Sequence, residues 1–401
     1  MILRTTYLAK IAPFVGQPVI KAITGIRRVG KSFFVRQLMD NLRKQGVPEP
    51  NLVYVDMESL RFDAIRTYHD LHAHVAARIK KAHGKIHVFI DEVQDIAEWE
   101  RAVASWAGDG KRFDVTITGS NSTLFSGGLA TKLTGRYVEF PIYPLSLPEF
   151  VQFRDESSIS SDQTLAEYFR FGGMPGIHDL GELADGTAMP YLDAIYNTIL
   201  LKDVVQRHNI RNTSLLVSMG RYAFDNIGNL LSANRISSYL KSQRIAANVQ
   251  SVVNYLDAMT DAQLFFRVPR YDLRGKRHFE INDKFYATDL GLRHSQIGFR
   301  DADISGILEN LVYVELRRRG YRVSVGQWGD REIDFVAEKS GTPHYFQVTL
   351  HLDNPDVVAR ETTPLLAISD NHPKTIITLS RLHGDDIRGI VVISLDEFLA
   401  G

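Results

Sequence analysis

The chain has 401 residues, a net charge of zero, 44% hydrophobic residues and 23% charged residues. This composition is typical of a globular protein and excludes collagen-like, coiled-coil and disordered classes. Cysteine is absent, which excludes disulfides, cysteine zinc sites and thiol nucleophiles. No apolar run approaches the roughly 18 residues of a membrane span. Because Arg4 and Lys10 also interrupt the apolar N-terminus, we expect a cytoplasmic protein without a membrane partner.

The charge is uneven along the chain. Residues 1–100 carry a net charge of +4, residues 101–200 carry −5, residues 201–300 carry +7 and residues 301–401 carry −6. A basic segment is where contacts with nucleic-acid phosphates are expected, but it also serves as an ordinary solvated surface. Charge alone leaves both interpretations open.

A phosphate-binding loop is predicted near the N-terminus. A strand pattern over residues 18–23 runs into the segment GIRRVGKS at residues 25–32, and residues 33–39 have helical spacing. Glycines let backbone N–H groups wrap a phosphate, and the helix start adds a partial positive charge. In this pattern Lys31 reaches the β- and γ-phosphates, and the Ser32 hydroxyl binds Mg²⁺. The candidate nucleotide-binding residues are Gly25, Arg28, Gly30, Lys31, Ser32 and Phe33.

A second strand pattern, over residues 85–90, ends in Asp91 and Glu92. Its continuous apolar run is typical of a strand buried in a parallel sheet, where ligands bind at the carboxyl ends of the strands. Asp91 is therefore a candidate for the Mg²⁺ shell, and Glu92 is the candidate that polarises the attacking water. A solvated helix N-terminus is the alternative explanation for such a pair.

Two more polar positions are candidates. The strand pattern over residues 113–118 is followed by Ser120 and Asn121, of which we favour Asn121 as a contact for the γ-phosphate or the water. Ser and Asn also cap helices after a turn, so that alternative stays open. Arg136 lies in a glycine-containing turn, where it is either a finger for the γ-phosphate of a neighbouring subunit or a surface residue.

The motifs form an ordered set along the chain. They are GIRRVGKS, HVFIDEVQDI, ITGSNS, LTGRY, YPLSLPEF, FGGMPG, LKDVV, KFYATDLGL and REIDF. This set resembles the AAA+-class P-loop ATPases of bacteria and archaea that carry a C-terminal domain of unknown function. The resemblance implies an AAA+ fold, hydrolysis of ATP with Mg²⁺, and a homo-oligomeric ring such as a hexamer. It favours Arg136 as the arginine that completes the next subunit's site, and it assigns no role to the paired Arg27 and Arg28.

The expected fold is α/β, with an AAA+ nucleotide-binding domain over residues 1–150 and a helical lid over residues 151–220. Residues 221–295 show helix, turn, helix and then two strands joined by a basic turn, which is the layout of a winged helix. Its second helix would enter a DNA groove while the hairpin contacts phosphates. Winged helices that bind proteins are the alternative. The candidate DNA contacts are Lys241, Arg244, Arg267, Arg270, Arg274, Lys276 and Arg277.

Residues 296–401 alternate strands and helices, and Glu309 and Asp334 stand in an order that resembles the restriction-endonuclease-like PD-(D/E)XK fold. Active members of that fold place an acid and a lysine on the next strand, where this chain has Gln347 and Thr349. Neither side chain replaces the lost carboxylate or the lysine. We therefore expect a nuclease-like fold without nuclease activity.

Three functions follow from these features. The first is an ATP-driven protein that assembles into a ring and binds or remodels DNA, including branched DNA. The second is an ATP-dependent regulatory switch that binds a protein partner. The third, an ATP-regulated nuclease, is the least favoured because of Gln347 and Thr349.

Overall fold

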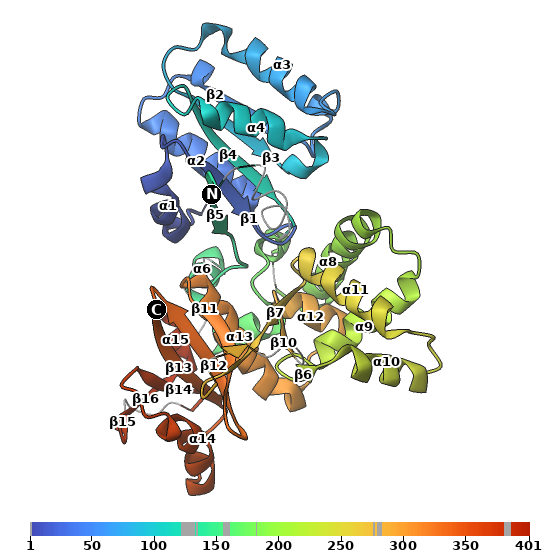
Figure 1. Ribbon diagram of the computed structural model, residues 1–401, viewed down its shortest axis with the longest axis vertical. Coiled ribbons are helices and arrows are strands. Elements are labelled where there is room, and N and C mark those ends of the chain that lie inside the picture. The colour runs from blue at the N-terminus through green and yellow to red at the C-terminus, as the bar shows by residue number, and fades with distance from the viewer. Residues whose placement is uncertain are drawn as a thin grey trace. The chain divides into compact units, whose positions relative to one another are not determined.

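The computed structural model describes residues 2–121, 133, 135–154, 161–181, 183–275, 277–278, 283–380 and 386–401. The chain divides into two compact units, Met1–Ile142 with Asp261–Gln263, and Tyr143–Thr260 with Leu264–Gly401 (Figure 1). The first unit ends at Ile142, and the segment after it bonds within the second unit. There the Leu145 N–H donates to the Gly173 carbonyl at 2.7 Å. None of the helices in the described ranges is both long and apolar enough to span a bilayer.

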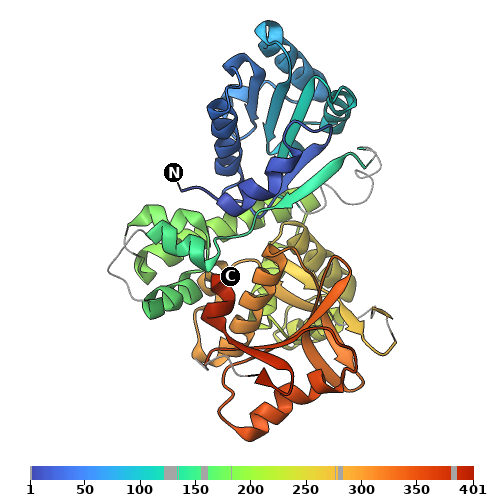
Figure 2. The same cartoon turned by 90° about the vertical axis from the view of Figure 1, so that its left-hand side faces the viewer.

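The first unit is a parallel sheet with helices on both faces (Figure 2). The five strands are ordered β2-β3-β4-β1-β5, and every neighbouring pair is parallel. The strands are β1 (Ile20–Thr24), β2 (Leu52–Asp56), β3 (Ile86–Asp91), β4 (Phe113–Gly119) and β5 (Tyr137–Pro141). The helices are α1 (Thr5–Ile11), α2 (Lys31–Lys44), α3 (Tyr68–Arg78) and α4 (Trp99–Gly108). This architecture confirms the predicted α/β class.

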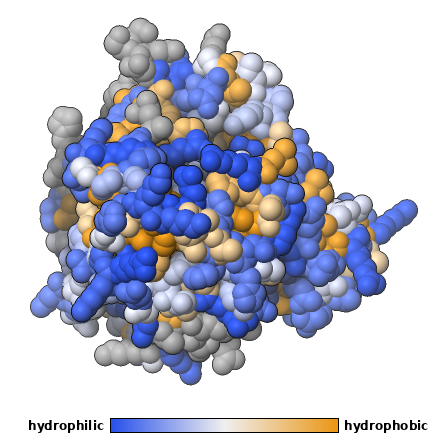
Figure 3. All heavy atoms as spheres, turned by 90° about the horizontal axis from the view of Figure 1, so that it is seen from above, coloured by the Kyte–Doolittle hydropathy of each residue, from blue (hydrophilic) through white to orange (hydrophobic). Residues whose placement is uncertain are grey.

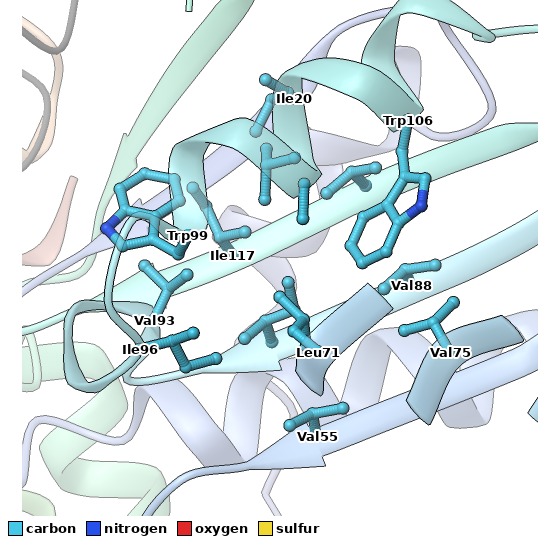
Figure 4. Close-up of a cluster of buried hydrophobic side chains, with 14 of the residues drawn as sticks. Ile20, Val55, Leu71, Val75, Val88, Val93, Ile96, Trp99, Trp106 and Ile117 are labelled. Atoms are coloured by element: carbon cyan, nitrogen blue, oxygen red, sulfur yellow. The ribbon is translucent and has the colours of Figure 1, made fainter. Parts of the chain in front are cut away.

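Alternate side chains of each strand face opposite layers of helices. Val88 and Ile117 belong to the core that α3 and α4 cover, whereas Phe89 and Thr116 lie beside α1 and α2. Burial on both faces explains why β1, β3 and most of β4 have hardly any exposed residue. Figure 4 shows the first of these two cores, with Leu71, Val75, Trp99 and Trp106 supplied by the helices.

The second unit begins with helices. They are α6 (Leu147–Arg154), α7 (Ser161–Phe171), α8 (Asp185–Ile199), α9 (Thr213–Asp225), α10 (Ala233–Ser242) and α11 (Val249–Asp261). A π-helical turn over Leu200–Gln206 continues α8. After the strands that follow come α12 (Leu290–Ile297), α13 (Ile304–Arg318), α14 (Pro355–Ala367) and α15 (Leu395–Ala400).

Two sheets complete the second unit. The small sheet has the order β6-β10-β7, with β6 (Leu230–Leu231), β7 (Phe265–Val268) and β10 (Asp283–Ala287). The large sheet has the order β15-β16-β14-β13-β12-β11-β8-β9. Its strands are β8 (Arg270–Asp272), β9 (Arg277–His278), β11 (Arg322–Trp328), β12 (Arg331–Lys339), β13 (Thr342–Thr349), β14 (Lys374–Thr378), β15 (Asp386–Ile387) and β16 (Ile390–Ser394).

The predicted basic hairpin differs from the structure. β7 and β10 do pair in antiparallel register, as expected, but the chain between them does not form a simple turn. β8 instead pairs in parallel with β11 of the large sheet and carries β9 on its outer edge. This pairing satisfies backbone donors and acceptors along the edge of β11, which an unpaired strand edge would leave without partners. The basic segment therefore belongs to two sheets.

Asp289 joins two of the sequence motifs in the second unit. Its carboxylate accepts the Gly173 N–H at 2.7 Å and the Leu292 N–H at 3.0 Å. Gly172, at φ +69°, lies so close that an added Cβ would be 2.5 Å from this carboxylate, so glycine is required there. Burial raises the pKa of Asp289 to about 6, although these backbone donors oppose the rise. The FGGMPG and KFYATDLGL motifs are thus explained by packing.

We predict that Asp289→Ala loosens this junction. The substitution leaves two buried N–H groups without an acceptor, and each such loss costs about 1–3 kcal/mol. Amide hydrogen exchange at Gly173 and Leu292 should therefore accelerate by about tenfold or more. The matched control is Asp301→Ala, which removes an exposed carboxylate and should leave both amides unchanged. Equal exchange in the Asp289 variant and the wild type would contradict the role of Asp289.

Candidate functional site

The phosphate loop follows β1 and ends where α2 begins at Lys31. Gly30 adopts φ +99° at the N-cap of α2, a left-handed conformation that favours glycine. At Gly25, an added Cβ would lie 2.5 Å from the Ile142 carbonyl oxygen. Both predicted glycines are therefore required by the backbone, and the loop presents the N-terminus of a 14-residue helix to a ligand.

Lys31 and Glu92 form an ion pair at the carboxyl edge of the sheet. The Lys31 ammonium lies 3.2 Å from Glu92 Oε1 and donates to the Gly25 carbonyl at 2.9 Å. Burial alone would raise the pKa of Glu92, but the charges of Lys31 and Arg27 outweigh it and lower the pKa to about 2. A carboxylate so stabilised is a weak base, so this arrangement holds the predicted water activator in an inactive pairing.

Asp91 lies beside Glu92 and is almost fully buried. One carboxylate oxygen accepts the Tyr54 hydroxyl at 2.9 Å, and the other accepts the Thr118 hydroxyl. A carboxylate has about four lone-pair sites, so each oxygen keeps capacity for a metal or a metal-bound water. Mg²⁺ prefers such oxygen ligands and is usually held by one or two carboxylates with substrate phosphates. Asp91 and the half-buried Ser32 at the start of α2 thus fit this ion.

Thr118 is a site residue that the sequence analysis missed. Its hydroxyl donates to Asp91 and accepts the Glu92 N–H at 2.9 Å, so it fixes both acids. Glu92 adopts φ +53°, an uncommon conformation for this residue, and that bond supports it. The parallel register that pairs Ile90 with Ile117 brings Thr118 beside Asp91. Aligning the ends of the two predicted strands would have found it.

Other predicted residues lie at or near this edge. Asn121 follows β4 and is half-buried, next to the fully buried Ser120. Arg28 is exposed and adopts φ +68°. Phe33 is 57% exposed, and the Arg36 guanidinium lies 5.7 Å from the centre of its ring. Single exposed hydrophobic residues are normal, and Figure 3 shows such side chains scattered among hydrophilic ones on one face.

Arg136 lies at the opposite edge of the sheet. It precedes β5, whose first residue Tyr137 pairs with Ile20 at the start of β1, whereas the phosphate loop follows Thr24 at the end of β1. A five-residue strand separates the two edges by about 16 Å. The exposed Arg136 side chain is therefore remote from the phosphate loop of its own chain.

The predicted DNA contacts have unlike surroundings. Lys241 and Arg244 are exposed near the end of α10. Arg267 pairs with Asp283 and, at 3.3 Å, with Asp257. Arg270 bonds to Gln327, and the Arg274 guanidinium lies 5.1 Å from the ring centre of Trp328. Arg277 lies 3.9 Å from Asp272. Lys276 lies outside the described residues. Carboxylates thus offset part of the basic charge.

A groove of about 530 Å³ runs beside α11. Arg211, Asn254, Tyr255 and Asp257 line it, together with His208, Asn209 and Ile210. α11 itself has no Lys or Arg, although the winged-helix prediction gives this helix the groove-binding role. Arg211, which the sequence analysis overlooked, supplies an exposed positive charge there.

A buried ionic cluster forms around Lys284 and includes Glu309, one of the two acids that suggested a nuclease-like fold. The Lys284 ammonium lies 2.8 Å from Glu309 and 2.7 Å from Glu332, and Tyr286 also donates to Glu309. Burial alone would lower the pKa of Lys284, but the charges of Glu309, Asp334 and Glu332 raise it. Lys284 comes from β10, so the sequence analysis did not connect it with these acids.

The cluster borders a cavity of about 950 Å³ whose lining includes Glu309, Asp334, Gln347 and Thr349. Gln347 accepts the Asp334 N–H at 3.3 Å, and the Val348 N–H donates to Asp334 at 2.7 Å. Burial raises the pKa of Asp334 well above its usual range, and the charge of Glu309 adds to that rise. No set of three or more acidic or histidine side chains in the described ranges is arranged to hold a metal ion.

Comparison with known proteins assigns the chain to a family. Residues 17–151 match an AAA domain, and residues 162–303 match a domain of unknown function (DUF8612). An uncharacterized protein of Haemophilus influenzae is 36% identical over 401 residues, which is 100% of this chain and 98% of that protein. The chain belongs to the same family of AAA+ P-loop ATPases. An uncharacterized protein of Methanocaldococcus jannaschii is 31% identical over 315 residues, 75% of this chain and 67% of the relative.

The AAA+ ATPase fold is also similar to a solved structure. The Walker-type ATPase of Pyrococcus abyssi has a TM-score of 0.51 and 14% identity, covering 73% of this chain and 94% of that one. The resemblance inferred from the ordered motifs is thus confirmed for the AAA+ family and for the α/β fold with a parallel central sheet. The winged-helix assignment stays a prediction, because the family model that matches residues 162–303 describes a domain of unknown function. The nuclease-like assignment of residues 296–401 also stays a prediction.

We predict that Lys284→Met destabilises the AAA+ protein by about 3 kcal/mol, since removing one partner of a buried ion pair leaves uncompensated charge. The measurement is the free energy of urea unfolding, followed by circular dichroism. The control is Lys202→Met at an exposed position, which should change the free energy by less than about 0.5 kcal/mol. A Lys284→Met protein as stable as the wild type would refute a structural role for this ammonium.

Proposed function

We propose that this AAA+ protein hydrolyses ATP with Mg²⁺, assembles into a ring and uses hydrolysis to act on DNA. The observation that carries the ATPase part is the convergence of Lys31, Asp91 and Glu92 at one edge of a parallel sheet, beside a helix N-terminus. Phosphoryl transfer needs cations for the phosphates, an oxygen ligand for Mg²⁺ and a base for water. Each of these has a candidate side chain here.

Hydrolysis requires Glu92 to leave its partner. When a triphosphate binds, Lys31 turns to its phosphates, and Glu92 becomes free to accept a proton from water. The water oxygen then bonds to the γ-phosphorus while the bond from that phosphorus to the bridging oxygen of ADP breaks. Bound Mg²⁺ would offset charge on the phosphate oxygens, with Ser32 and Asp91 as its protein ligands. Thr118 keeps Asp91 and Glu92 in register throughout.

The proposed ring rests on the position of Arg136. Its location at the edge of the sheet opposite the phosphate loop supports a contact with a neighbour rather than with its own nucleotide. An arginine supplied in trans stabilises charge on the transferring phosphoryl group. In this proposal every site is complete only after assembly, and a hexamer is the size implied by the family resemblance.

DNA is the proposed partner of residues 213–287. The order α9, β6, α10, α11, β7, β10 is that expected of a winged helix, which supports the assignment. We assign phosphate contacts to the exposed Lys241, Arg244 and Arg211, and base contacts to Gln250 and Asn254 of α11. Amide side chains suit base edges, whereas arginine and lysine suit phosphates.

A protein partner is the second candidate. Arg267 and Arg270 are already engaged by Asp283 and Gln327, which lowers the free positive charge that a polyanion would meet. In this reading hydrolysis drives assembly, and the second unit binds the partner. Cleavage of DNA is not proposed, because Gln347 and Thr349 stand where an acid and a lysine would be needed and Glu309 is already paired with Lys284.

The ATPase proposal predicts different effects for two substitutions. Lys31→Ala should abolish binding of ATP, because it removes the cation for the β- and γ-phosphates. Glu92→Gln should bind ATP but hydrolyse it at least about a hundredfold more slowly, since the amide cannot take the proton. Calorimetry with ATP and a phosphate-release assay provide the two measurements. A Glu92→Gln protein that hydrolyses at the wild-type rate would disprove the role of Glu92.

The DNA proposal predicts a change in salt dependence. Replacing Lys241 and Arg244 together with alanine should lower the slope of log affinity against log salt by about 2, one for each lost phosphate contact. Arg267→Ala is the matched control, because Asp257 and Asp283 already offset its charge, and it should leave the slope unchanged. Fluorescence anisotropy with duplex and branched DNA measures the slope. If neither DNA binds at low salt, the DNA proposal is rejected and the protein partner becomes the favoured candidate.

A further inference from the structure

The two arginines of the phosphate loop have different environments. Arg27 is 7% exposed, and its guanidinium donates to Glu58, which follows β2. Arg28, the next residue, is exposed. The sequence analysis placed Arg28 among the nucleotide contacts and gave Arg27 no role, whereas the structure buries Arg27 and leaves Arg28 exposed.

Arg27 reaches across the edge of the sheet that carries the two acids. Its loop follows β1 and its partner Glu58 follows β2, whereas β4 and β3 lie between these two strands in the sheet. The guanidinium therefore crosses the edge where Asp91 and Glu92 stand at the end of β3. Since Glu92 has to lie beside the attacking water, a cation close to it lies near the position of the γ-phosphoryl group.

The ion pair between Arg27 and Glu58 is weak enough to be exchanged. Glu58 is 44% exposed, so solvent screens its attraction for the guanidinium. A phosphate offers more negative charge and accepts two parallel N–H bonds from arginine. A triphosphate entering the loop is thus a stronger partner for Arg27 than Glu58 is.

We propose that Arg27 is a catalytic residue supplied by the same chain as the phosphate loop, in addition to the arginine proposed to come from a neighbour. The inference rests on the proposed ATPase function. When ATP binds, the Arg27 guanidinium exchanges Glu58 for an oxygen of the γ-phosphoryl group. It stabilises the charge on that group as the water oxygen bonds to phosphorus and ADP departs. The proton of the water goes to Glu92 and then to the released phosphate, while Arg27 stays protonated.

The test compares variants of the full chain. Arg27→Gln should slow single-turnover hydrolysis by about a hundredfold or more, the scale of losing a donor to the developing charge. It should also reduce the preference for ATP over ADP by about tenfold, because only ATP has the γ-phosphoryl group. Arg61→Gln is the control, and we expect it to change both quantities by less than about twofold, since this exposed arginine lies outside the phosphate loop. Equal losses in the two variants would overturn the assignment.

The Glu58→Gln variant distinguishes a catalytic role of Arg27 from a purely structural one. If Arg27 only ties the phosphate loop to the segment after β2, Glu58→Gln must reproduce the defect of Arg27→Gln, and that result would overturn the proposal. We expect instead an unchanged hydrolysis rate and a tighter binding of ATP, because Arg27 no longer has to leave a carboxylate. The affinity ratio of ATP to ADP is measured without turnover. This ratio therefore tests the contact between Arg27 and the γ-phosphoryl group even if the wild type does not hydrolyse ATP. A lack of hydrolysis would refute only the proposed hydrolysis.

Discussion

The ion pair between Lys31 and Glu92 joins the two halves of the nucleotide site. Lys31 begins the helix after β1, Glu92 follows β3, and β4 lies between those strands in the sheet. The pair can form only because parallel strands bring their carboxyl ends to one edge, and because Thr118 at the end of β4 holds both acids. The contact therefore depends on the strand order and on the backbone conformation of Glu92. In the proposed mechanism, phosphate competes for Lys31 before Glu92 accepts a proton.

Buried charges in the second unit are compensated by several partners. Asp289 is held by backbone N–H groups of two distant motifs, and Lys284 is held by Glu309 and Glu332. In both places a charged group is removed from water and compensated by several partners, which is the condition under which burial of charge is tolerated. Leaving such a buried group without partners would cost folding free energy. A motif that looks catalytic in a sequence can therefore be required for stability instead.

The phosphate loop and the acids after β3 were predictable because their patterns are local. A glycine spacing, a strand and a helix start stand within a few residues, and the backbone angles of Gly25 and Gly30 agree with them. Thr118, Arg27 and Lys284 were not found, since their roles depend on register between strands and on burial. The path of residues 270–278 was also unpredictable, because pairing of β8 with β11 depends on a strand edge from a later part of the chain.

The net charge of +7 over residues 201–300 overstates what a polyanion would meet. Arg267, Lys284, Arg293 and Arg300 all pair with carboxylates, some of which belong to other parts of the sequence. Counting charges along the chain cannot register such neutralisation, since the partners are brought together only by folding. Exposed positive charge stands at Arg211, Lys241 and Arg244, around the groove beside α11 and the end of α10. Other exposed basic residues of this segment include Lys202, Arg221, Arg235, Arg274 and Arg277. α11 carries Asp257 and Asp261 but no Lys or Arg. In the proposed DNA complex, the phosphates would therefore be contacted by residues around this helix, while its amide side chains meet the bases.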